Sequence, residues 1–166
     1  MRKLSFIVPV AVVLIALFMS TVFIVDERNK ALVLQFGRVV AVKEDPGLAF
    51  KIPFIQEVVF YDDRILSRDV DPLEVTPLDD RRLVVDAFTR YRITDVNQFR
   101  EAVGTGGVQV AESRLDSILK SEMREVLGSV SSNDILSSDR AVLMSRIRNA
   151  AIEKALPLGI EVVDVR

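Results

Sequence analysis

The sequence contains no cysteine and no histidine among its 166 residues. Without cysteine the chain has no disulfide and no thiol nucleophile, so its residues carry no information about the redox state of its compartment. Without histidine it has no serine–histidine triad and no imidazole for acid–base catalysis. The absence of both residues also removes the ligands of the usual zinc sites. These two absences exclude most of the common hydrolase and metalloenzyme classes.

The sequence also lacks a strong excess of either charge. Lysine and arginine number 22 against 24 aspartate and glutamate, a net charge of -2. Beyond Val25 the balance is 20 against 24, because Arg2 and Lys3 precede that point. A mildly acidic domain has no electrostatic footprint for nucleic acid, and Arg81-Arg82 is a pair rather than a basic patch. We therefore expect no nucleic-acid partner.

One long apolar run is present, from Leu4 to Val25. As a helix its 22 residues reach about 33 Å at about 1.5 Å per residue, enough to cross a hydrocarbon core of roughly 30 Å. A cleaved signal peptide would need a shorter apolar stretch and a small-x-small cleavage site, and neither is present. Arg2 and Lys3 favour a cytoplasmic tail over residues 1–3, which sends everything after Val25 across the membrane, into the periplasm of a bacterium. The run predicts a single transmembrane anchor.

The rest of the chain changes its hydrophobic period at residue 93. Residues 26–93 show short apolar runs broken by glycine and proline, which is typical of strands. The clearest is Leu83–Ile93, where apolar and polar residues alternate as in a half-buried strand. Residues 94–166 are mostly helical and end in a strand at Ile160–Val165 that we expect to rejoin an earlier sheet. This order predicts an α+β fold with a strand-rich part (26–93) and a helical part (94–166).

Three helices are predicted within the second part. Asp95 and Gln98 indicate a capped start for a short helix through Phe99 that stops at Gly104. A second helix runs from about Gln109 to Leu127, with Gly128 as its stop. Its predicted core face is Ala111, Leu115, Ile118, Leu119 and Val126. A third runs from about Asp139 to Leu156.

No group of residues in the sequence forms a convincing catalytic, cofactor or metal site. Gly104-Thr105-Gly106-Gly107 lacks the lysine and the βαβ context of a phosphate-binding loop, so a turn between helices is expected. Adjacent carboxylates on a strand point to opposite faces, and those in turns are usually solvated. This applies to the pairs Asp62-Asp63, Asp69-Asp71 and Asp79-Asp80. Lys120 and Ser121 lie about 100° apart on one helix, which does not make a dyad. We expect a protein without catalytic, cofactor or metal residues.

The segment from Pro46 to Ile55 is unusually apolar for a stretch bracketed by turn residues. One interpretation is a core strand. The other is that Leu48, Phe50, Phe54 and Ile55 contact the outer leaflet of the membrane, since exposed apolar patches close to a membrane usually mark contact with it. Both can hold for alternate residues.

Several ordered strings resemble the SPFH (band 7) family, which includes stomatin, prohibitin, flotillin and HflK/C. They are Phe36-Gly37-Arg38-Val39, Asp45 to Phe54, Asp63-Arg64-Ile65, Val85 to Phe88 and Tyr91-Arg92-Ile93. Thr105-Gly106-Gly107 and the closing Gly159 to Arg166 are similar to the HflK/C group in particular. The resemblance covers the anchor and nearly everything after it.

The resemblance implies an SPFH domain of two small α/β subdomains behind a membrane anchor in the bacterial inner membrane, the first subdomain lying against the membrane. It implies a noncatalytic scaffold that oligomerises with an HflK-like paralogue and controls substrate access to an FtsH-type membrane protease. A stomatin-like organiser of membrane domains, or a membrane-bound serine hydrolase or protease, are the alternatives. The coiled coil that follows the last strand in the family is absent from this sequence, which puts closure of a ring in doubt.

Overall fold

A computed structural model describes residues 12, 18–137 and 140–166. It divides the chain into two compact units, which we call the N-terminal unit (Met1–Asp63) and the C-terminal unit (Arg64–Arg166). The sequence placed a boundary at residue 93 instead. That prediction differs because it followed the change of period, whereas two long strands, β6 (Leu66–Val75) and β7 (Leu83–Ile93), form one sheet with the last strand of the chain and so belong to the second unit.

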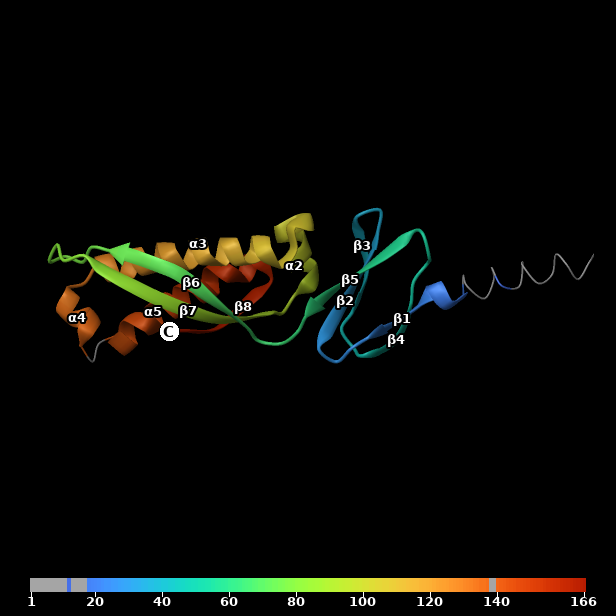
Figure 1. The fold of residues 1–166 in the computed structure, drawn as a ribbon, viewed down its shortest axis with the longest axis horizontal. Helices are drawn as coiled ribbons and strands as arrows, with labels where there is room; N and C mark the ends of the chain where they lie inside the picture. The colour runs from blue at the N-terminus through green and yellow to red at the C-terminus, as the bar shows by residue number, and fades with distance from the viewer. Residues whose placement is uncertain (1–11, 13–17, 138–139) are drawn as a thin grey trace, which may run out of the picture. The chain divides into compact units, whose positions relative to one another are not determined.

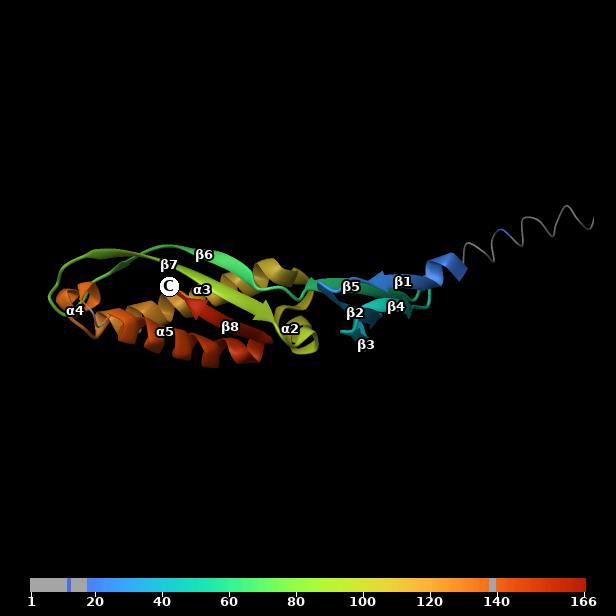
Figure 2. The same cartoon turned by 90° about the horizontal axis from the view of Figure 1, so that it is seen from below.

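The described part of the N-terminal unit contains two antiparallel sheets. The first joins β1 (Val22–Val25) to β4 (Gly47–Phe50). The second has the order β3-β2-β5, from β2 (Asn29–Gln35), β3 (Arg38–Lys43) and β5 (Gln56–Asp62). Figure 1 shows β2 between its two partners, and Figure 2 shows the same strands from below. The central strand β2 carries four successive buried residues, which is typical of a strand covered on both faces.

The two sheets pack together through small and β-branched side chains. Val25, Ala31 and Ala49 form a buried cluster, and Phe23 and Val58 pack against it. The rings of Phe23 and Phe60 meet edge to face with centroids 6.3 Å apart. One face of the β1-β4 pair is therefore used to hold the unit together.

The C-terminal unit is a three-stranded antiparallel sheet covered by helices on one face. Its strands are β6 (Leu66–Val75), β7 (Leu83–Ile93) and β8 (Ile160–Val165), with β7 in the centre. Its helical elements are α2 (Val96–Val103), η1 (Gly104–Gly106), α3 (Gly107–Gly128), α4 (Ser132–Leu136), α5 (Arg140–Ala155) and η2 (Leu156–Leu158). Figures 1 and 2 show α3 and α5 running along the sheet.

Most predictions for this unit are confirmed. β8 pairs with β7, and the inward face of β7 changes from half-buried at Leu83 to fully buried at Ile93. Asp95 caps α2 by accepting hydrogen bonds from the backbone N–H groups of Asn97 and Gln98 at 2.9 Å each. The turn at residues 104–107 joins two helices as expected.

Two details differ from the sequence predictions for the helices. In α3 the buried apolar residues are Ala111, Leu115, Leu119, Met123 and Leu127, whereas the predicted Ile118 and Val126 are half-buried. Met123 and Leu127, which the predicted core face left out, are buried instead. The short helix α4 was not predicted, since five residues are too few to display a helical period.

The predicted transmembrane helix from Leu4 to Val25 is wrong at its C-terminal end. Val22–Val25 form strand β1, held to β4 in the register Ile24↔Leu48, while residues 18–21 are helical. Residues 1–11 and 13–17, which carry most of the prediction, lie outside the described residues. Within the described residues, no helix combines the length and the apolar character needed to cross a bilayer.

Candidate membrane-contact surface

The outer face of the β1-β4 pair is apolar and exposed. Side chains alternate across a strand, so Val25 and Ala49 point into the unit while Ile24, Leu48 and Phe50 point out. Ile24 and Leu48 lie directly opposite one another and are each 70% exposed, and Phe50, which lies opposite Val22, is 67% exposed. We call Val22, Ile24, Leu48 and Phe50 the strand face. All four residues of the strand face are apolar.

The loop between β4 and β5 presents a second apolar group. Phe54 is 93% exposed and has a φ of +66°, a left-handed conformation that a non-glycine residue rarely adopts. The loop is closed on itself, because the Gln56 N–H donates to the Ile52 carbonyl at 2.9 Å and the Ile52 N–H donates to Gln56 Oε1 at 2.8 Å. These two bonds hold the loop in the shape that projects Phe54 outward.

The turn between β2 and β3 brings Phe36 to the same end of the sheet. Gln35 and Gln56 are register partners, so the residue after one strand and the residue before the other leave the sheet together. Phe36 is 85% exposed with a φ of +50°, and Ile55 is 43% exposed. Figure 1 shows the β2–β3 turn and the start of β5 at one end of the unit. We call Phe36, Ile52, Phe54 and Ile55 the loop tip.

The structure thus exposes all four residues that the sequence proposed for membrane contact. Leu48 and Phe50 lie on the strand face, and Phe54 and Ile55 lie at the loop tip. Strand β4 pairs only with β1, and Ala49 is its only buried residue. Sequence reasoning missed Ile24 and Phe36. Ile24 lies inside the apolar run, where its neighbours are apolar as well. Its outward direction follows from the alternation of side chains along a strand, which applies only once β1 is known to be a strand.

One member of each carboxylate pair weighed as a catalytic candidate has a partner within the fold. Asp63 pairs with Lys30 at 3.0 Å, and Asp71 pairs with Lys120 at 3.2 Å. Asp79 accepts hydrogen bonds from the hydroxyl and, at 3.1 Å, the backbone N–H of Ser132, which holds the β6–β7 connection on the start of α4. The hydroxyl hydrogen bond lowers the pKa of Asp79 below its ordinary value. The described residues contain no group of three or more potential metal-ligating side chains.

A partly buried polar cluster lies between the sheet and α3. Tyr91 donates to Glu112 at 2.8 Å, and Arg68 meets Asp116 at 3.1 Å and Glu112 at 3.6 Å. Burial, and then the hydrogen bond to Glu112, raise the pKa of Tyr91 above its ordinary value. The cluster joins β6, β7 and α3 and contains no nucleophile beside a base. We interpret it as a link between sheet and helix.

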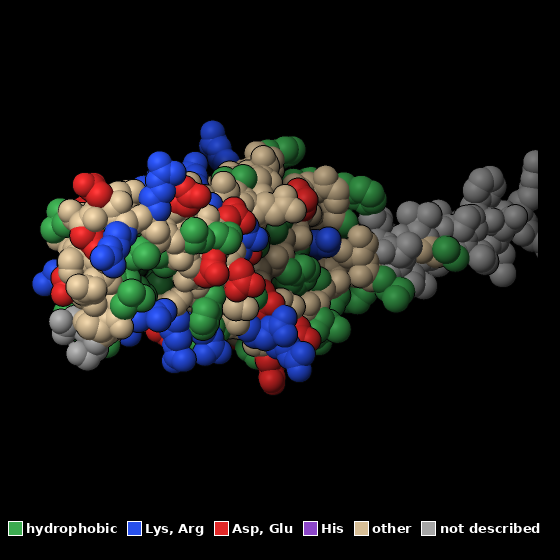
Figure 3. Space-filling view, turned by 60° about the vertical axis from the view of Figure 1, so that its left-hand side comes forward, with side chains coloured by type: hydrophobic (Ala, Val, Ile, Leu, Met, Phe, Trp, Pro, Cys, Tyr) green, Lys and Arg blue, Asp and Glu red, His purple; other side chains and the backbone are tan. Residues whose placement is uncertain are grey.

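The face shown in Figure 3 mixes acidic and basic side chains over the C-terminal unit, with hydrophobic side chains between them. This distribution contrasts with the strand face and loop tip of the N-terminal unit, where the exposed side chains are apolar. Exposed apolar surface of this kind usually marks a site that binds a protein or a membrane.

Comparison with known proteins places the chain in a family. The SPFH domain / Band 7 family matches residues 23–166. The chain is 33% identical over 156 residues to the "Modulator of FtsH protease HflC" of Escherichia coli (strain K12), covering 90% of this chain and 46% of that protein. It is 30% identical over 170 residues to "Protein HflC" of Haemophilus influenzae, covering 97% of this chain and 58% of that protein.

"Protein HflC" of Vibrio parahaemolyticus is 27% identical over 202 residues, which cover all of this chain and 61% of that protein. The chain spans about half the length of the curated relatives it matches. The family match begins at Phe23, inside β1, and includes both units. The chain belongs to the SPFH (Band 7) family.

Proposed function

We propose that the chain is a noncatalytic, membrane-attached subunit that regulates proteolysis by an FtsH-type membrane protease, together with an HflK-like paralogue. The observation that carries the proposal is the match over 90% of the chain to a protein named as a modulator of that protease. The polar clusters agree with a scaffold, because Asp63, Asp71 and Asp79 are engaged in ion pairs and hydrogen bonds within the fold.

Membrane attachment in this proposal has two parts. The first is the uncharged run Leu4–Thr21, whose 18 residues reach about 27 Å as a helix, close to the roughly 30 Å of a hydrocarbon core. The second is contact of the strand face and the loop tip with the outer leaflet. Moving an exposed apolar side chain out of water lowers the free energy, by roughly 1.5–3 kcal/mol for each fully buried large side chain. In a bacterium the two units then lie on the periplasmic side of the inner membrane.

Co-purification from gently solubilised membranes tests the proposed partners. Recovery of HflK-like chains and an FtsH-type protease with this chain is the expected result. Failure to recover either one, with the chain itself intact, contradicts protease regulation and leaves a stomatin-like organiser of membrane domains as the better function. A Phe88→Ser variant, altered on the sheet of the C-terminal unit, serves as a matched control for nonspecific loss.

The noncatalytic part of the proposal has its own test. A serine-directed fluorophosphonate probe should leave the folded chain unlabelled, whereas a serine hydrolase or protease would react. Heat-denatured chain provides the background. Labelling that is lost on denaturation would establish an activated serine and contradict the proposal.

Leaflet contact can be measured with tryptophan fluorescence, because the chain contains no tryptophan of its own. We expect Phe54→Trp in proteoliposomes to emit at shorter wavelength and to be quenched by lipids brominated along their acyl chains. Phe88→Trp is the matched control, since Phe88 lies on the sheet of the C-terminal unit. Equal, weak quenching of the two variants would exclude insertion of the loop tip.

A further inference from the structure

The connections between the strands of the N-terminal unit lie at two opposite ends of its sheets. The β1–β2 turn leaves β1 after Val25, and the β3–β4 connection enters β4 at Gly47, the register partner of Val25. The loop between β4 and β5 instead leaves β4 after Phe50 and enters β5 at Gln56, opposite Gln35. We call the end at Val25 and Gly47 the distal end, and the end that carries the loop tip the tip end.

The distal end of the unit is acidic. Its two connections carry four carboxylates, all of them exposed: Asp26, Glu27, Glu44 and Asp45. Arg28 and Lys43 are the basic residues beside them. Over residues 26–28 and 43–46, four carboxylates therefore stand against two basic side chains, a net charge of -2.

The tip end carries basic side chains next to its apolar ones. Arg38 is exposed, two residues after Phe36, and Lys51 is half-buried between a residue of the strand face and a residue of the loop tip. Neither side chain forms an ion pair with any described residue. The carboxylate at this end, Glu57, lies on β5, which β2 separates from the strand that carries Arg38. The charge at the tip end is thus opposite in sign to that at the distal end.

The backbone of Lys51 is joined to the end of the apolar run. The Lys51 N–H donates to the Thr21 carbonyl at 2.7 Å, which extends the β1–β4 ladder by one bond. Thr21 is the last residue of the segment proposed above to cross the bilayer, so in that arrangement Lys51 lies at the level of the lipid headgroups. A lysine there can lay its methylene groups along apolar neighbours and keep its ammonium group among phosphates. An arginine such as Arg38 can bind a phosphate with two parallel hydrogen bonds.

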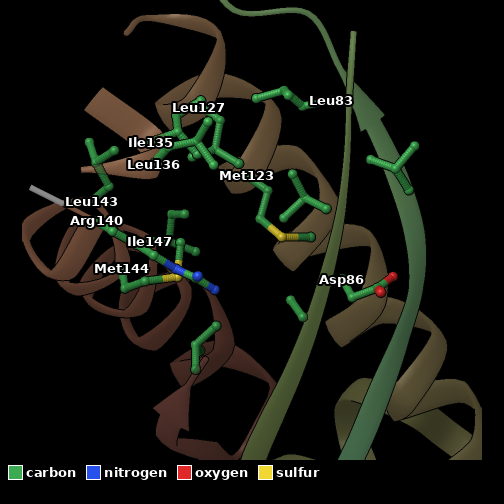
Figure 4. A pocket seen from close by; sticks show the side chains of 14 residues that line it. Leu83, Asp86, Met123, Leu127, Ile135, Leu136, Arg140, Leu143, Met144 and Ile147 are labelled. Atoms are coloured by element: carbon green, nitrogen blue, oxygen red, sulfur yellow. The ribbon is translucent and has the colours of Figure 1, made fainter. Parts of the chain in front are cut away.

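The apolar pocket of the C-terminal unit provides a comparison. It has a volume of about 260 Å³ and is lined by side chains that include Met123 and Leu143. Its charged lining residues are Asp86, on β7, and Arg140, which Figure 4 shows apart from each other. One residue of each sign gives this pocket no excess of positive charge. Apolar surface flanked by basic side chains alone is therefore a property of the tip end and not of this pocket.

We propose that the tip end binds the headgroups of anionic phospholipids, and that Arg38 and Lys51 are the side chains that contact them. The proposal rests on the leaflet contact proposed above and adds the class of lipid. A zwitterionic headgroup carries a compensating ammonium group, so two basic side chains favour lipids of net negative charge. The acidic distal end is repelled by the same surface, which favours the orientation in which the strand face and the loop tip meet the lipid.

Headgroup preference is measured with the full chain carrying Phe54→Trp, in proteoliposomes of equal parts phosphatidylcholine and phosphatidylglycerol. One sample carries bromine on the acyl chains of the phosphatidylglycerol, and the other carries it on those of the phosphatidylcholine. We expect stronger quenching of the tryptophan by brominated phosphatidylglycerol. At low salt, each basic side chain should favour the anionic lipid at the tip end by about fivefold, and the two together by about twenty-five-fold. The preference should decrease as sodium chloride is added, because salt screens exposed charges.

Two double variants in the same tryptophan background assign the preference to residues. Arg38→Gln with Lys51→Gln should make the two brominated lipids quench equally. Arg28→Gln with Lys43→Gln removes the same amount of charge from the distal end and should retain the preference. Urea unfolding of both variants checks that the fold is intact, and the salt dependence of the parent chain provides a test that needs no substitution at the tip end.

The outcomes separate this proposal from the leaflet contact on which it rests. Absence of quenching by either brominated lipid would contradict the contact itself. Equal quenching by the two lipids in the parent chain, or an unchanged preference in Arg38→Gln with Lys51→Gln, would retain the contact and overturn the headgroup preference. An equal loss of preference in the distal variant would assign it to overall charge. Loss of the preference in inorganic phosphate, but not in chloride of the same ionic strength, would assign the two side chains to a free anion.

Discussion

Removing the two exposed phenylalanines of the β4 region should weaken membrane binding without unfolding the protein. The perturbation is Phe50→Ser with Phe54→Ser. Phe50 is 67% exposed and Phe54 is 93% exposed, so both lose little packing when truncated. Substitutions at such exposed positions usually change the free energy of unfolding by less than about 0.5 kcal/mol.

The size of the effect follows from the exposed fractions. Full transfer of a large apolar side chain from water is worth roughly 1.5–3 kcal/mol, so the exposed parts of the two rings together offer about 2.5–5 kcal/mol. The interface of a bilayer retains water and headgroups. If half of the transfer free energy is realised there, the double substitution weakens binding by about tenfold to fiftyfold.

The assay is flotation of residues 22–166 with liposomes, at constant ionic strength, with urea unfolding as the check on folding. Phe88→Ser is the control of identical chemistry on the C-terminal unit, and it should leave binding unchanged. Two results would refute the reasoning: binding by the double variant that equals wild type with an intact fold, or an equal loss in Phe88→Ser.

Three further predictions concern the fold and topology. Gly159→Ala should destabilise the chain by more than about 2 kcal/mol in urea unfolding, because Gly159 has a φ of +69° and a Cβ there would lie 2.4 Å from the Asp95 carbonyl oxygen. Gly128→Ala, with open space around it, should be neutral or stabilising by up to about 1 kcal/mol; similar losses at both glycines would disprove the clash. The Asp79 pKa is lowered in the folded state, so its contribution is present above its unfolded pKa and fades as pH falls through the folded value. The stability difference between wild type and Asp79→Asn should therefore shrink from pH 7 to pH 3, and a constant difference would count against a charged Asp79–Ser132 contact. Alkaline phosphatase fused after Arg166 should be active in bacteria and a fused β-galactosidase inactive, whereas the reverse pattern would invert the topology.

The elements predicted best were those whose signals are local. β7 could be recognised because its inward positions are apolar or small at every second residue while Asp86, Arg90 and Arg92 fall on the other face, and α2 because its cap lies within three residues of its start. The return of β8 to an earlier sheet could be expected from the order of elements alone, although its pairing with β7 in particular could not. Its register could not, because the bulge between Arg90 and Tyr91 depends on how the two strands twist together.

The boundary between units could not be read from the period of the sequence. Residues 64–93 look like the strands before them, and only pairing with a strand about 70 residues later assigns them to the C-terminal unit. The cluster of Tyr91, Glu112 and Arg68 could not be predicted for the same reason, because its residues lie far apart in the sequence and come from three elements. An apolar stretch between turns is compatible with exposure or with burial, and the sequence left both open for Leu48, Phe50, Phe54 and Ile55. The structure exposes all four side chains, and their contact with lipid stays a prediction.

The apolar run Leu4–Val25 was predicted as one helix, but its last four residues form strand β1. Every residue of an uncharged apolar segment is compatible with a membrane-spanning helix. The residues Val22–Val25 therefore carry no signal that the helix ends and a strand begins. Their partner β4 supplies the difference, since Gly47–Phe50 offers backbone groups in register and a small Ala49 where the sheets meet. If Leu4–Thr21 crosses the bilayer, β1 follows directly at Val22 and stays close to the membrane surface by chain connectivity. Ile24 and Leu48 lie side by side by register, so they would reach the leaflet together. Contact of the strand face with lipid stays a prediction, and the flotation assay of Phe50→Ser with Phe54→Ser tests it.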